Sequence, residues 1–325
     1  MGFLYSQLFK RLPYPTGSYA NKTVVITGSN VGLGKEAARH FARLGVARLI
    51  LAVRNLDKGQ AAKQDIEATT GRKDVIQVWQ LNMSSYASVQ EFAARVDAEL
   101  DRVDIFLANA GVARTQFHMA EKDEEMITVN AVSTALLMAL VLPKMKATAA
   151  QLKTRPTFTI TSSVVHEHTQ FPQKSAPEGQ LFTTISDQAT AEKHWEEQYP
   201  LSKLLEVLFV RAVAHDNPAS EFPVTVNCVN PGLCHSELGR EVNSWGFWLV
   251  KLILARSVEV GSRTLVHAGS QGAESHGQYL SDCEISAPGP FVTSKEGKVA
   301  QERVMEELVK KLEDIKPGVT RSFST

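Results

Sequence analysis

The stretch VVITGSNVGLGKEAARHF, residues 24–41, decides the fold of this chain. An apolar, β-branched run ends in a glycine-rich turn, and an amphipathic helix pattern follows it directly. Glycines let a backbone approach a pyrophosphate closely, and a helix N-terminus offers free N–H groups and the positive end of its dipole. A glycine turn that binds no ligand is the alternative. The pattern predicts a phosphate-binding turn made of Gly28, Ser29, Asn30, Gly32, Leu33 and Gly34.

Beyond this turn, apolar runs bounded by glycine alternate with helix-length amphipathic stretches. Runs that are apolar throughout are typical of strands buried on both faces, and strands that alternate with helices indicate a parallel sheet. The sequence therefore predicts a single α/β domain of the Rossmann type at 21–325, a doubly wound parallel sheet flanked by helices, after an N-terminal extension at 1–20. We expect strands at 23–28, 48–53, 75–81, 103–111, 157–161 and 224–230, and helices that begin near Gly34, Asp57, Ser84, Glu124 and Tyr199.

The charge balance excludes some classes of partner. Lys+Arg and Asp+Glu number 35 each, so no field of one sign is present to attract nucleic acid. The three cysteines form no C-x-x-C pair, which suits a reducing, cytoplasmic compartment and argues against a disulfide framework or a metal site. His166 and His168 flank Glu167, but alternate residues of an extended chain point apart. Pocket lining or a plain loop is the preferred interpretation of these two histidines.

Two segments interrupt the regular alternation, at 164–198 and 233–256. Long excursions at the carboxyl ends of parallel strands usually enclose ligands. Aromatic residues within 245–249 favour a lid over an apolar substrate, and contact with a membrane surface is the alternative. The N-terminal apolar run is too short for a signal peptide or a transmembrane segment, and the apolar stretch at 245–255 is also too short to span a membrane. In the extension, we expect Phe3, Leu4, Leu8 and Phe9 to form a short amphipathic segment packed on the body, although MGFLYS also fits a myristoylation pattern.

The residue after the second predicted strand distinguishes the two nicotinamide dinucleotides. A site for NAD(H) usually offers a carboxylate there to the ribose 2′-hydroxyl. This strand ends LILAVRNLDKG, so Arg54 occupies the position and Asp57 lies beyond it, at the start of the next expected helix. A planar guanidinium suits a phosphate dianion. We therefore expect NADP(H) rather than NAD(H), with a solvated loop cation as the alternative for Arg54.

With TGSNVGLG, NAG, VN, SS, YPLSK and NPG in this order, the chain resembles the short-chain dehydrogenase/reductase family over about residues 21–285. LAVRNLDKG, GSRTLVHAG and GQYLSDCEISAPGPF are similar to its retinol-dehydrogenase-like branch, and in particular to fungal members in secondary metabolism.

The resemblance implies four catalytic residues. Tyr199 and Lys203 lie one helical turn apart, so both can act on one ligand, as general acid/base and its partner. The ammonium and an oxidised nicotinamide would both favour the phenolate. Asn130 matches the asparagine that supports a proton relay. Ser163 matches the serine that orients the substrate, and Ser162 is the alternative because the doublet leaves the register open by one.

The same resemblance implies further cofactor contacts, with two departures. Ala108 stands before the NAG motif where asparagine is frequent, and Asn82 stands where an aspartate usually faces the adenine. An amide oxygen can still accept a hydrogen bond there. The remaining contacts implied are Asn109, Ala110 and Gly111 beside the adenine ribose, Tyr199 and Lys203, and Pro231, Gly232 and Ser236 beside the nicotinamide carboxamide.

These residues predict an enzyme that interconverts a ketone or aldehyde and an alcohol on a fairly large apolar molecule. A non-catalytic NADP-binding regulatory or scaffold protein on the same fold is the alternative. We expect Pro200 in the first turn of its helix, where a missing N–H is harmless, with Tyr199 at the helix mouth. A homodimer through the Asn130 and Tyr199 helices is a further expectation, although their apolar faces would equally suit the core.

Overall fold

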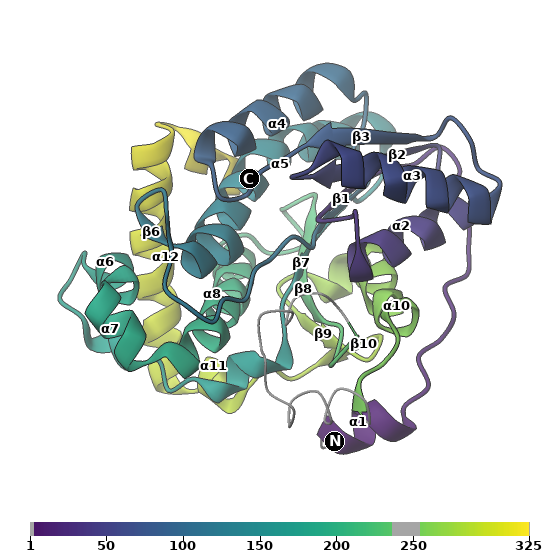
Figure 1. The fold of residues 1–325 in the computed structure, drawn as a ribbon. Coiled ribbons are helices and arrows are strands. Elements are labelled where there is room, and N and C mark those ends of the chain that lie inside the picture. The colour runs from purple at the N-terminus through teal and green to yellow at the C-terminus, as the bar shows by residue number, and fades with distance from the viewer. Residues whose placement is uncertain (1–2, 236–253, 325) are drawn as a thin grey trace.

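The computed structural model describes residues 3–235 and 254–324. At its centre is an eight-stranded sheet in the order β10-β9-β8-β7-β4-β1-β2-β3 (Figure 1). Its described strands run parallel except β10, which pairs antiparallel with β9 at one edge. The strands are β1 (Thr23–Thr27), β2 (Arg48–Val53), β3 (Ile76–Gln80), β4 (Ile105–Ala108), β7 (Thr157–Thr161), β8 (Thr225–Asn230), β9 (Tyr279–Ser281) and β10 (Glu284–Ser286).

The strands confirm the predicted sheet. β2 and β7 have the expected bounds, and β1 and β8 are buried along their whole length, as strands covered on both faces must be. Val24 in β1 pairs with Leu49 of β2 on one side and with Ile105 of β4 on the other. The chain order therefore reverses beside β1, where doubly wound sheets bind ligands. β9 and β10 were not expected, because three-residue strands are too short to show a periodic pattern.

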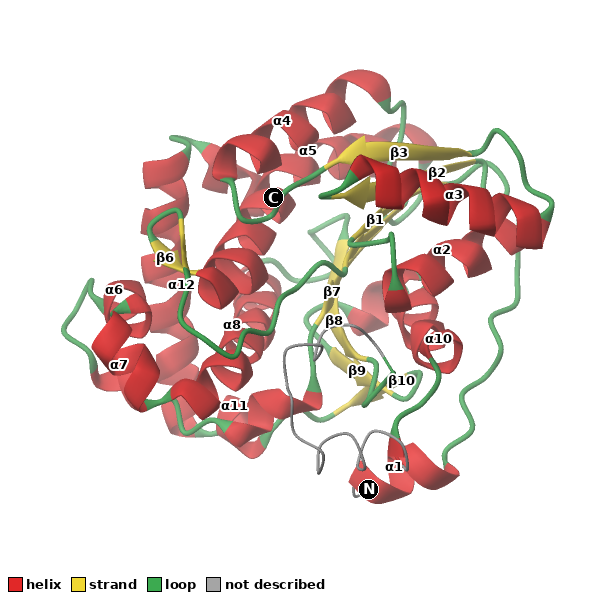
Figure 2. Cartoon of the chain, viewed as in Figure 1, coloured by secondary structure: helices red, strands yellow, loops and turns green. Residues whose placement is uncertain are grey.

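Helices cover both faces of the sheet and form two apolar cores (Figure 2). One face carries α2 (Gly32–Arg43), α3 (Leu56–Thr70) and α10 (Val258–Gly269). The other carries α4 (Tyr86–Glu99), the π-helical turn η1 (Ile127–Val132), α5 (Ser133–Leu152) and α8 (Trp195–Asp216). A small separate hairpin joins β5 (Met119–Ala120) to β6 (Asp123–Glu124). The architecture is the single α/β domain that the sequence predicts.

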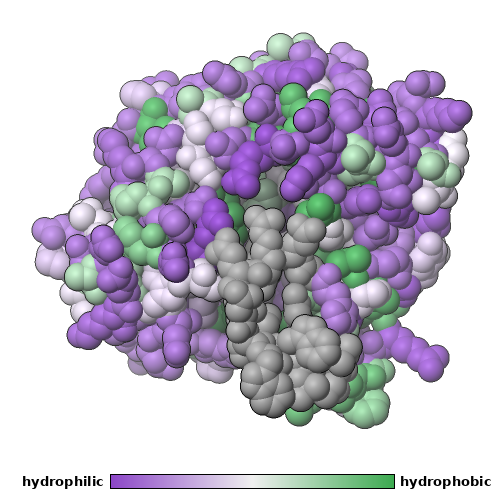
Figure 3. All heavy atoms as spheres, in the orientation of Figure 1, coloured by the Kyte–Doolittle hydropathy of each residue, from purple (hydrophilic) through white to green (hydrophobic). Residues whose placement is uncertain are grey.

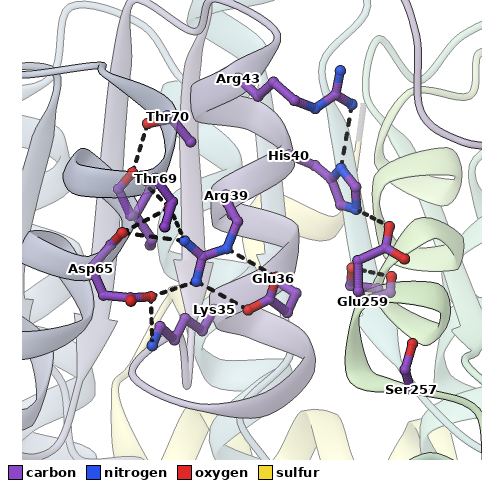
Figure 4. A network of polar contacts seen from close by, with 12 residues as sticks. Lys35, Glu36, Arg39, His40, Arg43, Asp65, Thr69, Thr70, Ser257 and Glu259 are labelled. Carbon is purple, nitrogen blue, oxygen red and sulfur yellow. Dashed lines mark hydrogen bonds and ion pairs between the residues drawn. The ribbon is translucent and has the colours of Figure 1, made fainter.

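Polar contacts tie α2 to its neighbours on both sides (Figure 4). Lys35 and Arg39 both contact the carboxylate of Asp65 in α3, Lys35 at 2.9 Å. On the opposite side, the ring of His40 lies 3.0 Å from Glu259 of α10. The helix that follows the glycine turn is thus fixed from two directions, which holds its N-terminus in place.

The C-terminal helix covers the faces that were expected to form a dimer. α12 (Lys295–Ile315) packs on α8, and η6 (Val319–Phe323) packs on α5. The rings of Phe209 in α8 and Phe323 in η6 meet edge to face, with centroids 5.6 Å apart. This packing favours the alternative that the apolar faces of these helices belong to the core. The oligomeric state stays a prediction.

Residues 164–198 fold into short helices that lead into α8: η2 (Val164–His168), η3 (Pro172–Ser175), α6 (Leu181–Ser186) and α7 (Gln188–Lys193). α8 begins at Trp195, four residues before Tyr199, so the expected helix start was wrong. Pro200 therefore lies inside the helix, where its ring removes one backbone hydrogen bond to the preceding turn. Tyr199 lies in the second turn of α8 rather than at its mouth.

The N-terminal helix α1 (Phe3–Phe9) contacts the body through its polar face. Gln7 is 9% exposed, whereas Leu4, Leu8 and Phe9 are 59%, 50% and 69% exposed. The expectation that Leu4, Leu8 and Phe9 pack on the body was wrong, because the docking site consists of backbone and charged groups that only polar side chains satisfy. In Figure 3, most of the visible face is hydrophilic, and apolar atoms gather at the lower edge, where Figure 1 places α1.

Among the described residues, one helical stretch, Ile127–Leu152, is long and apolar enough to cross a membrane. Within its most apolar window, 83% of the residues are buried inside the protein. That burial is typical of a core helix. The short helices η5 (Ala273–Ser275) and α11 (Pro290–Thr293) complete the described elements.

Candidate active site

Four of the predicted site segments follow the carboxyl ends of strands, so the parallel sheet brings them to one edge. The glycine turn follows β1, Asn109 follows β4, Ser162 follows β7 and Pro231 follows β8. In the glycine turn, Gly28 has φ +64°, and a Cβ on it would lie 2.9 Å from the Cα of Ala110. A side chain at Gly28 would therefore collide with the neighbouring strand end.

The N-terminus of α2 is open. Val31 precedes the helix in an extended conformation, no side chain caps the helix, and its first turn carries no acidic residue. Free N–H groups without a capping carboxylate are the donors that a phosphate group fits. Ser29 does not compete for them, because its buried hydroxyl donates to the carbonyl of Ile26 at 2.9 Å.

Asn109 holds the glycine turn in place. Its side-chain amide donates to the carbonyl oxygens of Thr27 at 2.9 Å and of Gly28 at 3.3 Å. The hydroxyl oxygen of Thr27 accepts the backbone N–H groups of Asn109 and Ala110 at 3.0 and 2.8 Å. Gly34 is required beneath this clamp, because a Cβ there would lie 2.6 Å from the Asn109 amide nitrogen.

Arg54 and Asn82 lie at the carboxyl ends of the next two strands. Arg54 follows β2 and is exposed, and within residues 3–235 and 254–324 its guanidinium has no ion-pair or hydrogen-bond partner. Its charge is therefore available to a ligand. Asn82 is partly buried, and its side-chain oxygen accepts the N–H of Ser84 at 3.2 Å, which shapes the turn into α4. The Asn82 contact with adenine stays a prediction.

Tyr199 and Lys203 are placed together by α8. The ammonium of Lys203 lies 5.8 Å from the ring centroid of Tyr199 and is itself buried. It donates to the carbonyl of Thr161, at the end of β7, at 3.0 Å, and contacts the carboxylate of Glu206 at 2.8 Å. An ammonium has three donors, so one is left for a ligand.

The surroundings keep both groups protonated. Burial raises the pKa of Tyr199 above its ordinary value; the Lys203 ammonium opposes this shift, and Glu206 adds to it. For Lys203, burial alone would lower the pKa, but Glu206 and Tyr199 outweigh that effect and raise it. The Lys203 ammonium does favour the phenolate form of Tyr199, as expected. In the protein alone, burial and the Glu206 carboxylate outweigh this effect, so the pKa of Tyr199 is raised.

Asn130 lies in the π-helical turn η1, completely buried. Its side-chain oxygen accepts the N–H of Val112, and its amide donates to the carbonyl of the same residue, both at 2.9 Å. A second amide hydrogen reaches the hydroxyl of Ser202 in α8 at 2.9 Å. Local π-helical turns are frequent at functional sites. Gly111 keeps this region open, because a Cβ there would lie 3.2 Å from the Asn130 oxygen and 3.5 Å from the Lys203 ammonium.

The two serines of the doublet have different surroundings. Ser162 is 2% exposed, and its hydroxyl donates to the backbone carbonyl of Lys203 at 3.1 Å. Ser163 is only partly buried, in an extended conformation at the start of η2. His166 holds it there: the ring accepts the N–H of Gly289 at 2.8 Å through Nε2, so Nδ1 carries the proton that Ser163 O accepts at 2.7 Å. This arrangement favours Ser163 as the residue that faces a ligand.

Pro231 and Gly232 follow β8, and the N-terminal helix supports them. Gly232 has φ +78°, and a Cβ on it would lie 2.4 Å from the side-chain oxygen of Gln7. The Gln7 amide donates to the carbonyls of Leu233 and Leu254, each at 2.9 Å. One side chain thus joins both ends of the second excursion. Ser236 and residues 245–249, to which roles were assigned from the sequence, lie outside the described residues.

A shallow hollow lies near the start of α8. Phe117 and Trp195 face each other across it, with ring centroids 6.5 Å apart, and Gln188 and Glu192 of α7 complete its rim with Thr115 and Gln116. Trp195 is one helical turn before Tyr199. A second hollow, between α6 and α12, is lined by Lys310, Lys311, Glu307 and other residues and is separate from these strand ends.

Sequence reasoning missed several residues that organise the site. Thr27 and Ser202 gave no signal, because single hydroxyl residues are common. Gln7 gave none because the apolar residues around it suggested the wrong docking face. Glu206 could have been found, because a carboxylate within the otherwise apolar run LLEVLFV needs a buried partner.

Comparison with known proteins places the chain in a family. A family model described as short chain dehydrogenase matches residues 22–152. The short chain dehydrogenase/reductase dmxR8 of Cryptosporiopsis sp. (strain 8999) is 70% identical over 99% of this chain and 100% of its own length. The short-chain dehydrogenase anuD of Penicillium roqueforti is 43% identical over 98% of this chain and 84% of its own length.

A solved structure shares the fold. The Pseudomonas aeruginosa RhlG/NADP active-site complex aligns with a TM-score of 0.61 at 20% identity, over 83% of this chain and 97% of that chain. The sheet order, the open glycine turn and the extent of the sequence similarity all indicate the same family. The chain belongs to the short-chain dehydrogenase/reductase family of oxidoreductases.

Proposed function

We propose that the protein is an NADPH-dependent carbonyl reductase, or an alcohol dehydrogenase running in reverse, that acts on a fairly large apolar ketone, aldehyde or secondary alcohol. The observation that carries this proposal is the pair Tyr199 and Lys203 on α8, with the Lys203 ammonium beside Gly111 and Asn130. A protein without catalysis would have no physical need to hold a buried lysine against a partly exposed tyrosine at this place.

The residues of this chain would manage the proton and the geometry. When bound, the nicotinamide of the cofactor supplies the hydride to the carbonyl carbon. Tyr199 is the proton donor to the carbonyl oxygen, and its raised pKa keeps it protonated at neutral pH. The Ser163 hydroxyl donates to the same oxygen and stabilises its developing negative charge. Lys203 holds the cofactor ribose through its remaining donor.

Several contacts support NADP(H) as the cofactor. The open N-terminus of α2 fits the pyrophosphate, and Arg54, which has no partner in the part of the chain that the structure describes, fits a 2′-phosphate on the ribose. Asn109, Ala110 and Gly111 would lie beside the adenine ribose, and Pro231 and Gly232 beside the nicotinamide. The RhlG structure of the same fold contains NADP. The choice of NADPH over NADH belongs to this proposal.

The apolar substrate class is supported by the hollow that Trp195 and Phe117 line, because Trp195 lies one turn before Tyr199 on α8 and its ring centroid is 6.5 Å from that of Phe117. Both relatives named above come from fungi, which supports a role in fungal secondary metabolism. A cytoplasmic location and the retinol-dehydrogenase-like branch remain predictions.

Thermal unfolding with NADPH, with NADH and without cofactor tests binding first. A cofactor at about 100 times its Kd should add about 2.7 kcal/mol to the free energy of unfolding. We expect a clear shift with NADPH and a smaller one with NADH. A shift with neither would turn the proposal toward a protein that does not use this cofactor.

Tyr199→Phe then tests catalysis. Loss of the phenol proton should lower carbonyl reduction by about 10²–10⁴-fold while the shift with NADPH stays. Tyr86→Phe is the control, because it removes the hydroxyl of another tyrosine, which lies 3.4 Å from Asp123, near α12 rather than the strand ends. Full activity in Tyr199→Phe would remove Tyr199 from the mechanism.

A further inference from the structure

A buried carboxylate lies directly behind the proposed catalytic pair. Glu206 follows Lys203 by three residues in α8 and is 3% exposed. Its Oε1 lies 2.8 Å from the Lys203 ammonium. Its Oε2 is buried and has no partner of good hydrogen-bond geometry among the described residues, although the nearby Ser162 hydroxyl stabilises the carboxylate. A buried carboxylate with so few partners is costly, so its retention next to a catalytic lysine calls for a reason.

Few other charges face this carboxylate. On α8 itself, Tyr199 and Lys203 lie on the side of the strand ends. From β8, the buried thiol of Cys228 faces Glu206, whose charge together with burial raises the pKa of that thiol. Arg211, one turn further along α8, acts on Cys228. From β7, only uncharged groups of Thr161 and Ser162 contact the pair in the described residues.

The ion pair fixes the position of the Lys203 ammonium. One N–H bond points to the Thr161 carbonyl and a second to Glu206, so rotation of the side chain is restrained from two sides. The third donor is left on the side of Gly111, where the backbone has no side chain. Lysine side chains otherwise lose considerable rotamer freedom when they are ordered, so this restraint prepares the group before a ligand binds.

The same contact changes the field at Tyr199. A lone ammonium at this distance would draw the phenol toward its phenolate form. The carboxylate cancels part of that charge, and burial strengthens the effect because the interior screens charges weakly. Consistent with this geometry, burial raises the pKa of Glu206 to about 7, and Glu206 in turn raises the pKa of Tyr199.

We propose that Glu206 is a positioning residue that holds Lys203 and offsets its charge, so that Tyr199 keeps its proton to higher pH and serves as the proton donor in carbonyl reduction. This inference rests on the proposed function. In the reduction, the new C–H bond would form with a hydride supplied by bound NADPH, and the C=O π pair would take the Tyr199 proton. The products are the alcohol, NADP⁺ and a phenolate that solvent reprotonates.

The phenolate absorbance of Tyr199 tests the proposal without a known substrate. The difference between each protein and its Tyr199→Phe counterpart, recorded against pH with saturating NADP⁺, gives the titration midpoint of this residue. In Glu206→Gln, we expect the midpoint to fall by about one pH unit or more. Glu307→Gln is the matched control, because Glu307 is also buried in a long helix and pairs with Arg303 at 3.0 Å, away from the site. The titration midpoint of Tyr199 should not move in Glu307→Gln.

Turnover provides a second readout. With benzil and NADPH, and with benzoin and NADP⁺, Glu206→Gln should shift the alkaline limit of reduction and the acid limit of oxidation to lower pH. Glu206→Asp keeps the negative charge on a shorter side chain, so its titration midpoint and pH limits should lie between those of the wild type and of Glu206→Gln. It also supplies the comparison if Glu206→Gln does not fold. An unchanged or higher midpoint in a folded variant overturns the role of Glu206. Wild-type protein that neither binds NADPH nor reduces a carbonyl refutes the proposed function instead.

Discussion

The side-chain amide of Asn130 donates a hydrogen bond of 2.9 Å to the hydroxyl of Ser202, the residue directly before Lys203. That hydroxyl in turn donates to the carbonyl of Tyr199 at 2.8 Å. The π-helical turn η1 is therefore joined to the turn of α8 that carries both proposed catalytic residues. Asn130 would support a proton relay, and in this structure it also fixes where α8 lies.

Asn130→Ala should impair both stability and turnover. It leaves the N–H and carbonyl of Val112 and the hydroxyl of Ser202 without their partner, which should cost about 1–3 kcal/mol of unfolding free energy. Urea unfolding and steady-state kinetics measure the two effects. Asn217→Ala is the control, because Asn217 is also buried and bonds the backbone at the far end of α8. Equal turnover in the two variants would leave Asn130 a structural residue.

The serine doublet can be resolved by two single substitutions. Ser163→Ala should lower turnover by about 10²-fold or more, because it removes a donor to the developing charge on the carbonyl oxygen. Ser162→Ala removes the bond to the Lys203 backbone and a hydroxyl that stabilises Glu206, which should cost about 1 kcal/mol of stability and less activity than Ser163→Ala. Kinetics at saturating NADPH make the comparison. A larger loss of activity in Ser162→Ala would shift the assignment by one residue.

Arg54→Ala should weaken NADPH binding without affecting stability. The side chain is exposed and has no partner within the described residues, so its removal breaks no internal contact. Loss of a charge-assisted bond of about 1.5–3 kcal/mol predicts about 10-fold to 100-fold weaker binding of NADPH and little change for NADH. Fluorescence titration gives both constants, with Arg321→Ala, another exposed arginine, as the control. Unchanged NADPH binding would make Arg54 a solvated loop cation.

Much of this arrangement follows from the sequence, for physical reasons. β2 and β7 were predicted to the residue, because strands buried on both faces are apolar throughout and end at polar or glycine positions. Tyr199 and Lys203 were recognised because i and i+4 spacing is visible in a linear sequence. The start of α8 was missed because Pro200 is an ordinary signal for a first turn, and only tertiary packing tolerates it deeper in the helix.

Contacts between distant segments left no trace in the sequence. Gln7 lies between apolar residues, and its two backbone acceptors are more than 200 positions away along the chain. Pairings of this kind depend on three-dimensional placement, which local periodicity does not encode.

Gln7→Ala should loosen the support beneath Gly232 and Leu233. It removes two donors to the carbonyls of Leu233 and Leu254 and an acceptor for the N–H of Leu233, with a cost of about 1–3 kcal/mol in unfolding free energy. Because Gly232 would contact the nicotinamide, we expect a higher KM for NADPH and a smaller change in kcat. Gln151→Ala, which replaces an exposed glutamine at the C-terminal end of α5, serves for comparison. An unchanged KM would limit Gln7 to a structural role.

His40 should make part of the stability depend on pH. Burial lowers its pKa, with Arg43 acting in the same direction and Glu259 against it (Figure 4). In the unfolded chain a histidine takes up its proton near pH 6.5, whereas the buried His40 resists protonation. Protonation therefore stabilises the unfolded chain, and the contribution of neutral His40 to the free energy of unfolding is lost as the pH falls below about 6.5. The contribution is fully present above that value.

Urea unfolding of His40→Gln between about pH 8 and about pH 5 tests this contribution. The free energy of unfolding should fall with decreasing pH in the wild type and less steeply in the variant, and other buried histidines should maintain the remaining slope. His168→Gln is the control, because His168 is exposed and its replacement should leave the slope as it is. If His40→Gln and the wild type lost stability in parallel, His40 would not be the group whose protonation opposes folding.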